Sequence, residues 1–151
     1  MKARVAVIGG GQNCEHEVSL ASASAVATAL EHTGYRVVRL RIGADGTWHD
    51  GGVQLPGLAD AVRILSGCDA VVPVVHGPRG EDGTLAALCD LAGITCVGSG
   101  LRAGALGMDK HVTKLVAAEC GIATAPAVLL TVPTAAGVPS TIPIQAVAPS
   151  R

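Results

Sequence analysis

Two polar loops hold the side chains that are best suited to bind a ligand. The first loop, residues 9–17, carries three consecutive glycines and Glu15, and the second, residues 76–84, carries His76 and Glu81 among three further glycines. A carboxylate can receive an ammonium group, an imidazole can exchange a proton near neutral pH, and backbone amides of a glycine-rich loop can hold an anionic group. Each loop directly follows an apolar run that predicts a strand. Because the carboxyl ends of parallel strands meet at one edge of a sheet, we predict a shared site.

The acidic residues of the first loop also have a purely structural explanation. Glu15 and Glu17 stand at the start of a predicted helix, where a carboxylate stabilises the positive end of the helix dipole by about 0.3–1 kcal/mol. We favour this explanation for Glu17. For Glu15, which lies in the loop itself, helix stabilisation and binding of a ligand ammonium both remain open.

The residues of the second loop can likewise be explained either by a structural role or by ligand binding. His76 ends an apolar run, where backbone groups often satisfy an imidazole, and Glu81 with Asp82 could simply cap the following helix. Gly77 and the glycines after it favour a ligand, because such a loop presents backbone amides to an anionic group. Lys110 lies at a later helix start, where the dipole disfavours a cation. It is therefore either a solvated surface lysine or a side chain that reaches a phosphate.

Alternating strands and helices must position these loops. Short links between strand-like and helix-like runs predict the α/β class, as a three-layer, open parallel β-sheet with helices on both faces, similar to a Rossmann fold. The predicted strands are residues 4–8, 35–42, 70–75 and 94–97, and the predicted helices are residues 17–32, 58–65, 84–92, 101–106 and 109–120.

Three local features refine this prediction. The run from 70 to 75 is apolar throughout, which favours a central strand with an irregularity at Pro73, because proline cannot donate to a sheet. Asp-Gly turn signals between residues 43 and 56 predict a small hairpin or an irregular excursion. The first helix has an apolar series at helical spacing, which is Val18, Ala21, Ala25 and Ala29.

The composition restricts the class of protein and of partner. The 151 residues fit one domain, and the 49% hydrophobic content includes no Phe, one Tyr and one Trp. A net charge of -1 without a basic run or an aromatic stacking surface argues against nucleic acid as a partner. No apolar stretch has the length of a membrane span or a signal peptide, so we expect no membrane partner and a cytoplasmic location.

The five cysteines are odd in number and form no C-x-x-C pair, so neither a disulfide scaffold nor a zinc site is predicted. Cys68, Cys89, Cys96 and Cys120 lie beside or within apolar runs and are expected to be buried, reduced thiols. Cys14 differs from them, since it lies in the first polar loop. We predict no metal-binding residues in this chain.

The glycines at positions 9–11 also invite the interpretation of a dinucleotide site, because glycine lets a phosphate approach the backbone at a helix start. The G-x-G-x-x-G spacing would need a third glycine where Cys14 stands. The second strand also ends with Arg39 and Arg41 rather than with an acidic residue that could hold a ribose. The sequence therefore disfavours a dinucleotide site.

Taken together, the motifs resemble the amino-terminal domain of D-alanine:D-alanine ligase, an ATP-grasp enzyme of peptidoglycan synthesis. The resemblance implies a Rossmann-like pre-ATP-grasp domain over residues 1–130, followed by a proline-bearing tail or the start of a missing central domain over residues 131–151. The matching segments keep the family's order and spacing and are Gly10-Gly11, Glu15 to Leu20, His76-Gly77, Gly80 to Thr84, Leu91 to Ile94, Val97 to Gly100, and Met108 to Lys110 with Thr113-Lys114.

The resemblance implies an ATP-driven ligation, in which one D-alanine carboxylate is phosphorylated and the amino group of a second D-alanine attacks the acyl phosphate. The family's pattern assigns catalytic and substrate-binding roles to Glu15, which would hold the first D-alanine, and to His76, which would lie close to the bound dipeptide. Gly77 and Glu81 would belong to the substrate loop, and Lys110 would meet the ATP phosphates. ATP and Mg²⁺ are the cofactors implied for the complete family enzyme.

The family's central and carboxy-terminal domains supply the phosphate-covering loop, the transition-state arginine and the magnesium carboxylates, and they have no counterpart in these residues. Two hypotheses follow. The first is the substrate-binding amino-terminal part of a ligase, inactive alone and completed by an ATP-grasp half or by a homodimer. The alternative is a non-catalytic module that binds D-alanine, D-alanyl-D-alanine or a protein partner.

Overall fold

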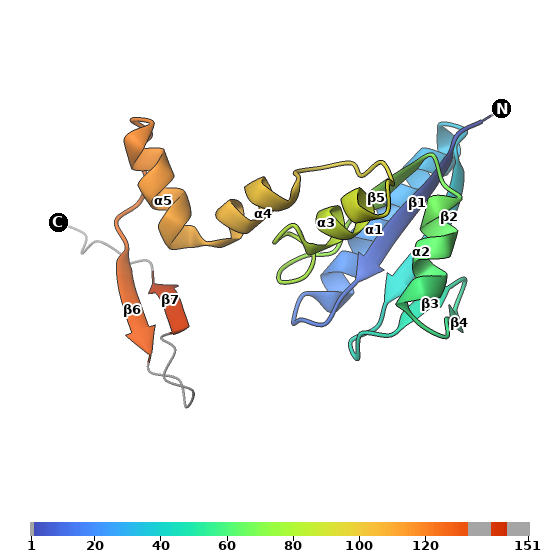
Figure 1. Cartoon of the computed structure of the whole chain (residues 1–151), viewed down its shortest axis with the longest axis horizontal. Coiled ribbons are helices and arrows are strands. Elements are labelled where there is room, and N and C mark those ends of the chain that lie inside the picture. The colour runs from blue at the N-terminus through green and yellow to red at the C-terminus, as the bar shows by residue number, and fades with distance from the viewer. Residues whose placement is uncertain (1, 133–139, 145–151) are drawn as a thin grey trace. The chain divides into compact units, whose positions relative to one another are not determined.

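The computed structural model describes residues 2–132 and 140–144. Strands and helices alternate as the sequence predicts, and the chain divides into two compact units, of which the first ends at Met108 and the second begins at Asp109. The elements in chain order (Figure 1) are β1 (Arg4–Gly10), α1 (His16–His32), β2 (Arg36–Ile42), β3 (Trp48–Asp50), β4 (Val53–Gln54), α2 (Leu58–Ser66), β5 (Ala70–Pro73), α3 (Thr84–Leu91), α4 (Leu101–Met108), α5 (Lys110–Glu119), β6 (Val128–Val132) and β7 (Ser140–Ile144).

The first unit contains a five-stranded open sheet in the order β4-β3-β2-β1-β5. Strands β2, β1 and β5 are parallel, with Val5 opposite Val37 on one side and opposite Ala70 on the other. Of the two alternatives expected between residues 43 and 56, the structure has the hairpin, which adds β3 and β4 as antiparallel strands beside β2. The α/β sheet is confirmed, but it is mixed rather than purely parallel.

The apolar strand expected at the centre of the sheet lies instead at the end of the ladder. The central strand is β1, and among the described residues β5 pairs with β1 and, through one isolated bridge, with Cys96. The predicted strand at 94–97 is reduced to this bridge, in which the Val71 amide donates to Thr95 O at 2.8 Å and the Val97 amide donates to Val71 O at 2.8 Å. Strand β5 ends at Pro73, which has no amide hydrogen to donate, and the next residue, Val74, still donates to Ile8 O of β1 at 2.8 Å.

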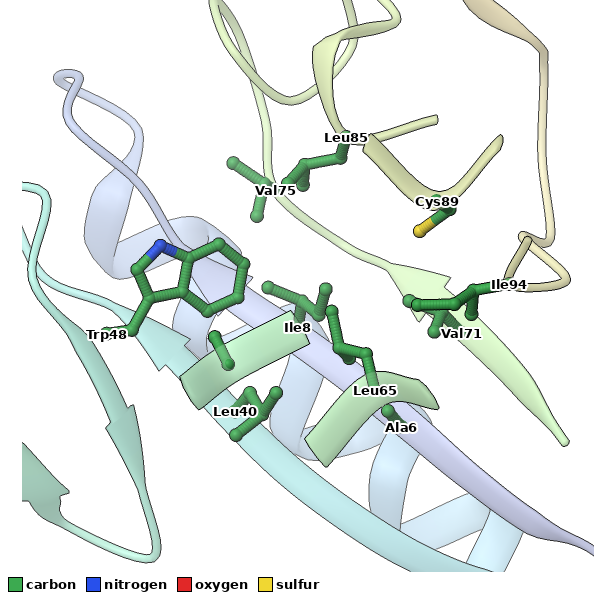
Figure 2. Close-up of a cluster of buried hydrophobic side chains, with 11 residues drawn as sticks. Ala6, Ile8, Leu40, Trp48, Leu65, Val71, Val75, Leu85, Cys89 and Ile94 are labelled. Carbon is green, nitrogen blue, oxygen red and sulfur yellow. The ribbon is translucent and has the colours of Figure 1, made fainter. Parts of the chain in front are cut away.

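Helices cover both faces of the sheet, as predicted. One face packs Val7 against Ala23 and Ala27 of α1. The other face packs against α2 and α3, around Ile8 and Leu65, which are fully buried. Figure 2 shows that second core, with the Trp48 ring at one end and Cys89 and Ile94 at the other. Successive residues of β1 therefore point alternately into two separate cores.

The apolar series of α1 that has helical spacing does not form the buried face of the helix. Val18 is 60% exposed, and Ala21, Ala25 and Ala29 are exposed as well. The buried positions are Ser19, Ala23 and Ala27. Alanine occurs on several sides of this helix, so hydrophobic periodicity alone could not select the packed face.

The second unit begins with the capped helix α5. Asp109 Oδ1 accepts hydrogen bonds from the amides of His111 and Val112, each at 3.0 Å, so Asp109 caps the helix, as an aspartate directly before a helix commonly does. Farther along, β6 and β7 pair as an antiparallel hairpin, with Val128 opposite Ile144. From residue 131 onward the sequence predicts either a proline-bearing tail or the start of a missing central domain. Residues 133–139 and 145–151 of the predicted tail lie outside the described residues, and the domain boundary at residue 130 stays a prediction.

Within the described residues, no helix is long and apolar enough to cross a lipid bilayer.

Candidate functional site

The loops that follow β1 and β5 come together at one edge of the sheet. Glu15 is the N-cap residue of α1, and its exposed carboxylate makes no capping hydrogen bond within the part of the chain that the structure describes. Its Oε2 atom lies 3.0 Å from the point where a Cβ atom on Gly77 would be. Gly77 has a φ of +66°, so both its conformation and its neighbour favour glycine. The predicted meeting of the two loops is thus present in the structure.

Ser19 joins the two strands beneath these loops. Its side chain is fully buried, and its hydroxyl accepts a hydrogen bond from the Gly10 amide at 2.9 Å and donates one to Val74 O at 2.6 Å. Because a buried hydroxyl is costly unless it is satisfied, this pair of bonds explains why a polar residue occupies the core face of α1. Ser19 therefore fixes where both loops begin.

The His76 ring lies between two polar side chains from different elements. Its Nε2 is 3.4 Å from Ser22 Oγ of α1, and its Nδ1 is 3.8 Å from Glu81 Oε1. Glu81 also accepts a hydrogen bond from the Gly77 amide at 3.0 Å through Oε2. Glu81 thus holds the turn of the second loop and faces the imidazole at the same time.

Ser22, His76 and Glu81 lie next to one another in the arrangement of a nucleophile, a base and an orienting acid, which would be needed for acyl transfer. Ser22 lies in the second turn of α1, where backbone amides are bonded within the helix and offer no pair of donors to a developing oxyanion. The Nε2 to Oγ distance of 3.4 Å is also long for a hydrogen bond. The arrangement fits orientation of the ring better than nucleophilic attack.

Asp82 accepts a hydrogen bond at the start of α3, whose N-cap residue is Gly83. Asp82 Oδ1 accepts from the Thr84 amide at 2.9 Å and its Oδ2 accepts from the Arg79 amide at 2.8 Å. Partial burial opposes ionisation, but the hydrogen bonds outweigh it and lower the pKa of the Asp82 carboxyl below its ordinary value. Glu81 and Asp82 were both candidates for capping the helix. Asp82 has a structural role at its start, whereas the Glu81 side chain contacts Gly77 and His76 instead.

The cysteines only partly follow the expected burial. Cys89 is buried, Cys68 and Cys96 are half-buried, and Cys14 and Cys120 are exposed. The expectation of burial was therefore wrong for Cys120, which follows the short helix α5 rather than lying in a core. Among the described residues, no three His, Cys, Asp or Glu side chains are grouped to hold a metal ion.

Comparisons with known proteins agree with this arrangement. A family model described as D-ala D-ala ligase N-terminus matches residues 4–61 and 54–99. The chain is 41% identical over 134 residues to the D-alanine--D-alanine ligase of Deinococcus radiodurans, a match that covers 81% of this chain and 40% of the relative. It is 37% identical over 150 residues to the enzyme of the same name from Chlorobium luteolum, covering 80% of this chain and 42% of the relative.

The chain belongs to the D-alanine–D-alanine ligase family. Solved structures place it in the same fold. The D-alanine-D-alanine ligase from Coxiella burnetii matches with a TM-score of 0.71 at 27% identity, covering 86% of this chain and 44% of that chain. VanG D-Ala:D-Ser ligase from Enterococcus faecalis matches with a TM-score of 0.73 at 30% identity, covering 87% of this chain and 46% of that chain. The chain thus spans less than half the length of these ligases.

In this ligase-family domain, the structure gathers four of the five residues singled out from the sequence. Glu15, His76, Gly77 and Glu81 share one edge of the sheet. Lys110 belongs to the second unit, as the first residue of α5 after its Asp109 cap.

Three residues of the site escaped sequence analysis, namely Asn13, Ser19 and Ser22. A serine within a helix of small apolar residues was the available signal for Ser19, since a polar residue on a packed face implies a bonded partner. The partners, however, lie 9 and 55 positions away in the chain, and spacing does not reveal such pairs.

Proposed function

We propose that this chain supplies the amino-terminal, substrate-binding part of an ATP-dependent D-alanine:D-alanine ligase of peptidoglycan precursor synthesis, acting in the cytoplasm. The observation that carries the proposal is the placement of the Glu15 carboxylate against Gly77, beside the His76 loop. The family membership of the chain adds the identity of the substrate class.

The side chains suit a small zwitterion. Glu15 is exposed and presents a carboxylate, which binds a ligand ammonium through charge-assisted hydrogen bonds. His76 stands on the other loop, where its ring can contact a bound dipeptide, and Glu81 fixes both the ring and the turn at Gly77. Glu15 and His76 would touch the substrate, whereas Gly77 and Glu81 would shape the loop around it.

ATP and Mg²⁺ place further demands on the site. Lys110 offers one cation for the phosphates of ATP, as a lysine does at many phosphate sites. The described residues hold no cluster of carboxylates that fits Mg²⁺, so we assign no step of phosphoryl transfer to them. Because that reaction depends on positioning and charge neutralisation, this part alone should not turn over, and the remaining groups would come from an ATP-grasp region or from a partner chain.

Calorimetry with D-alanyl-D-alanine and with D-alanine tests binding by this chain. Wild type should bind, and Glu15→Gln should bind about 10–100-fold more weakly, because a hydrogen bond to a charged group contributes roughly 1.5–3 kcal/mol. L-Alanyl-L-alanine is the matched ligand control. Absence of heat with wild type would remove the proposal for this chain.

An assay for ADP release separates the ligase part from a complete enzyme. With ATP, Mg²⁺ and D-alanine, the chain alone should release no ADP above background. Release by this chain alone would show that the catalytic groups are present after all. An ATP-grasp region can then be added to the chain. If the chain still binds the dipeptide but no ADP is released, the alternative of a non-catalytic binding module is favoured.

A further inference from the structure

One side-chain amide connects the two loops of the candidate site. Asn13 Nδ2 donates a hydrogen bond to His76 O at 2.7 Å, and Asn13 Oδ1 accepts one from the Glu15 amide at 2.8 Å. The first bond joins positions 63 apart in the chain, and the second is local. The Asn13 side-chain amide thus bonds through its nitrogen to the backbone of His76 and through its oxygen to the backbone of Glu15, the two residues proposed to touch the substrate.

Two glycines enclose this amide. A Cβ atom on Gly11 would lie 3.2 Å from Asn13 Nδ2, and one on Gly77 would lie 3.5 Å from the same atom. Both glycines have positive φ, +119° at Gly11 and +66° at Gly77. The backbone therefore approaches the Asn13 side chain closely at both glycines, and this packing limits the conformations of the side chain.

Among the described residues, the other side-chain contacts near the two loops do not connect the backbones of Glu15 and His76. Gln12 Oε1 accepts a hydrogen bond from Arg79, but both residues are exposed, and such contacts stabilise little. Ser22 and Glu81 face the ring of His76, not its backbone. Asn13 alone, among these contacts, fixes the backbone of His76 relative to that of Glu15.

We propose that Asn13 is a positioning residue, which holds the Glu15 carboxylate and the His76 imidazole at the separation that a small zwitterion requires. The ligand rests on the function proposed above, whereas the coupling of the two loops is a property of the unliganded chain. Preorganised loops do not have to be ordered by the ligand, so the cost of binding falls. Loss of the bridge should weaken binding more than it weakens folding.

Amide hydrogen exchange and NMR on the unliganded chain test the coupling directly. In Asn13→Ala, exchange of the Glu15 amide should rise about tenfold, the scale expected for one lost hydrogen bond, and the His76 and Gly77 resonances should shift. In Asn13→Asp, the Glu15 amide should stay protected because the acceptor remains, whereas the His76 and Gly77 resonances should shift because the donor is lost. This difference between variants would not arise from general destabilisation.

Cys14→Ser is the matched control, since Cys14 is the next residue of the same loop and its exposed side chain makes no hydrogen bond among those described. It should leave the exchange of Glu15 and the resonances of His76 as in wild type. If Asn13→Ala behaves like this control, the proposed coupling is wrong, whatever the chain binds.

Calorimetry with D-alanyl-D-alanine then measures the consequence. Asn13→Ala should bind at least about tenfold more weakly than wild type, since an unbridged site must be ordered by its ligand, and Cys14→Ser should bind like wild type. Equal binding by Asn13→Ala would overturn the positioning role. If wild type binds no dipeptide but exchange changes as expected, the proposed function fails while the coupling of the loops is supported.

Discussion

The hydroxyl of Ser19 donates a hydrogen bond to the carbonyl oxygen of Val74 at 2.6 Å, from a side chain that is fully buried. The Ser19 hydroxyl oxygen also accepts a hydrogen bond from the Gly10 amide at 2.9 Å. In Ser19→Ala, both backbone groups would lose their partner in a buried place, which costs about 1–3 kcal/mol. We expect the free energy of unfolding in urea to fall by that amount.

Ser24→Ala is the control for this substitution, because Ser24 lies in the same helix and is exposed. Alanine favours helix formation slightly, so this variant should match wild type or exceed it by up to about 0.5 kcal/mol. Equal stabilities of Ser19→Ala and Ser24→Ala would show that the two bonds of Ser19 contribute nothing.

The general fold could be read from local patterns. Apolar periodicity located the alternating elements, and glycine-rich loops after two apolar runs located the candidate site, because strand ends in a parallel sheet share an edge. The cap at Asp109 was also predictable, since its partners are two and three residues away. These features depend on residues that are close in sequence.

Features set by distant residues could not be read in this way. The packed face of α1 depends on the bond from Ser19 to Val74, 55 positions away. Strand β5 is apolar because α3 and the bridge to Cys96 cover it, which gives an edge strand the pattern of a central one. Asn13 is a polar loop residue by sequence, and only its bond to His76 O gives it a place in the site.

Gly77→Ala should damage the candidate site through the backbone. Gly77 has a φ of +66°, and the added methyl group would meet Glu15 Oε2 at 3.0 Å. We expect a loss of about 1–2 kcal/mol in unfolding free energy from the strained backbone, together with weaker dipeptide binding in calorimetry. Gly93→Ala provides a control, because Gly93 has a similar φ of +67° but open space around its Cβ position. Binding lost equally in both variants would contradict a specific effect at Glu15.

The Asp82 carboxylate should make stability depend on pH in the acid range. Its pKa in the folded state is lowered below the ordinary value of 3.8, where burial is outweighed by hydrogen bonds from Thr84 and Arg79. A carboxyl whose pKa is lower in the folded state stabilises the fold at pH values above its ordinary, unfolded-state pKa. That contribution disappears as the pH falls through the lowered, folded-state pKa. Wild type should therefore be more stable than Asp82→Asn at pH 7, and the difference should shrink below pH 3.8. Thermal unfolding of both proteins across this range measures it, and a constant difference would contradict the role of the charge.

Thiol labelling should distinguish the cysteines by exposure and should report on the site. Burial raises the pKa of the Cys89 thiol to about 11, so only roughly a thousandth of it is thiolate at about pH 8, and the thiolate is the reactive form. Burial also raises the pKa of Cys68 and of Cys96. Cys14 and Cys120 are exposed, and we expect these two to react first with a maleimide, as mapped by mass spectrometry.

Labelling of Cys14 has a second expected effect, because this residue adjoins both Asn13 and Glu15. A bulky group attached next to Glu15 in the same loop should obstruct the site, so we expect the labelled chain to lose affinity for D-alanyl-D-alanine. Cys14→Ser, treated with the same reagent, is still labelled at Cys120 and should keep its affinity. If the labelled wild type binds as well as the labelled Cys14→Ser variant, the dipeptide does not bind beside Glu15.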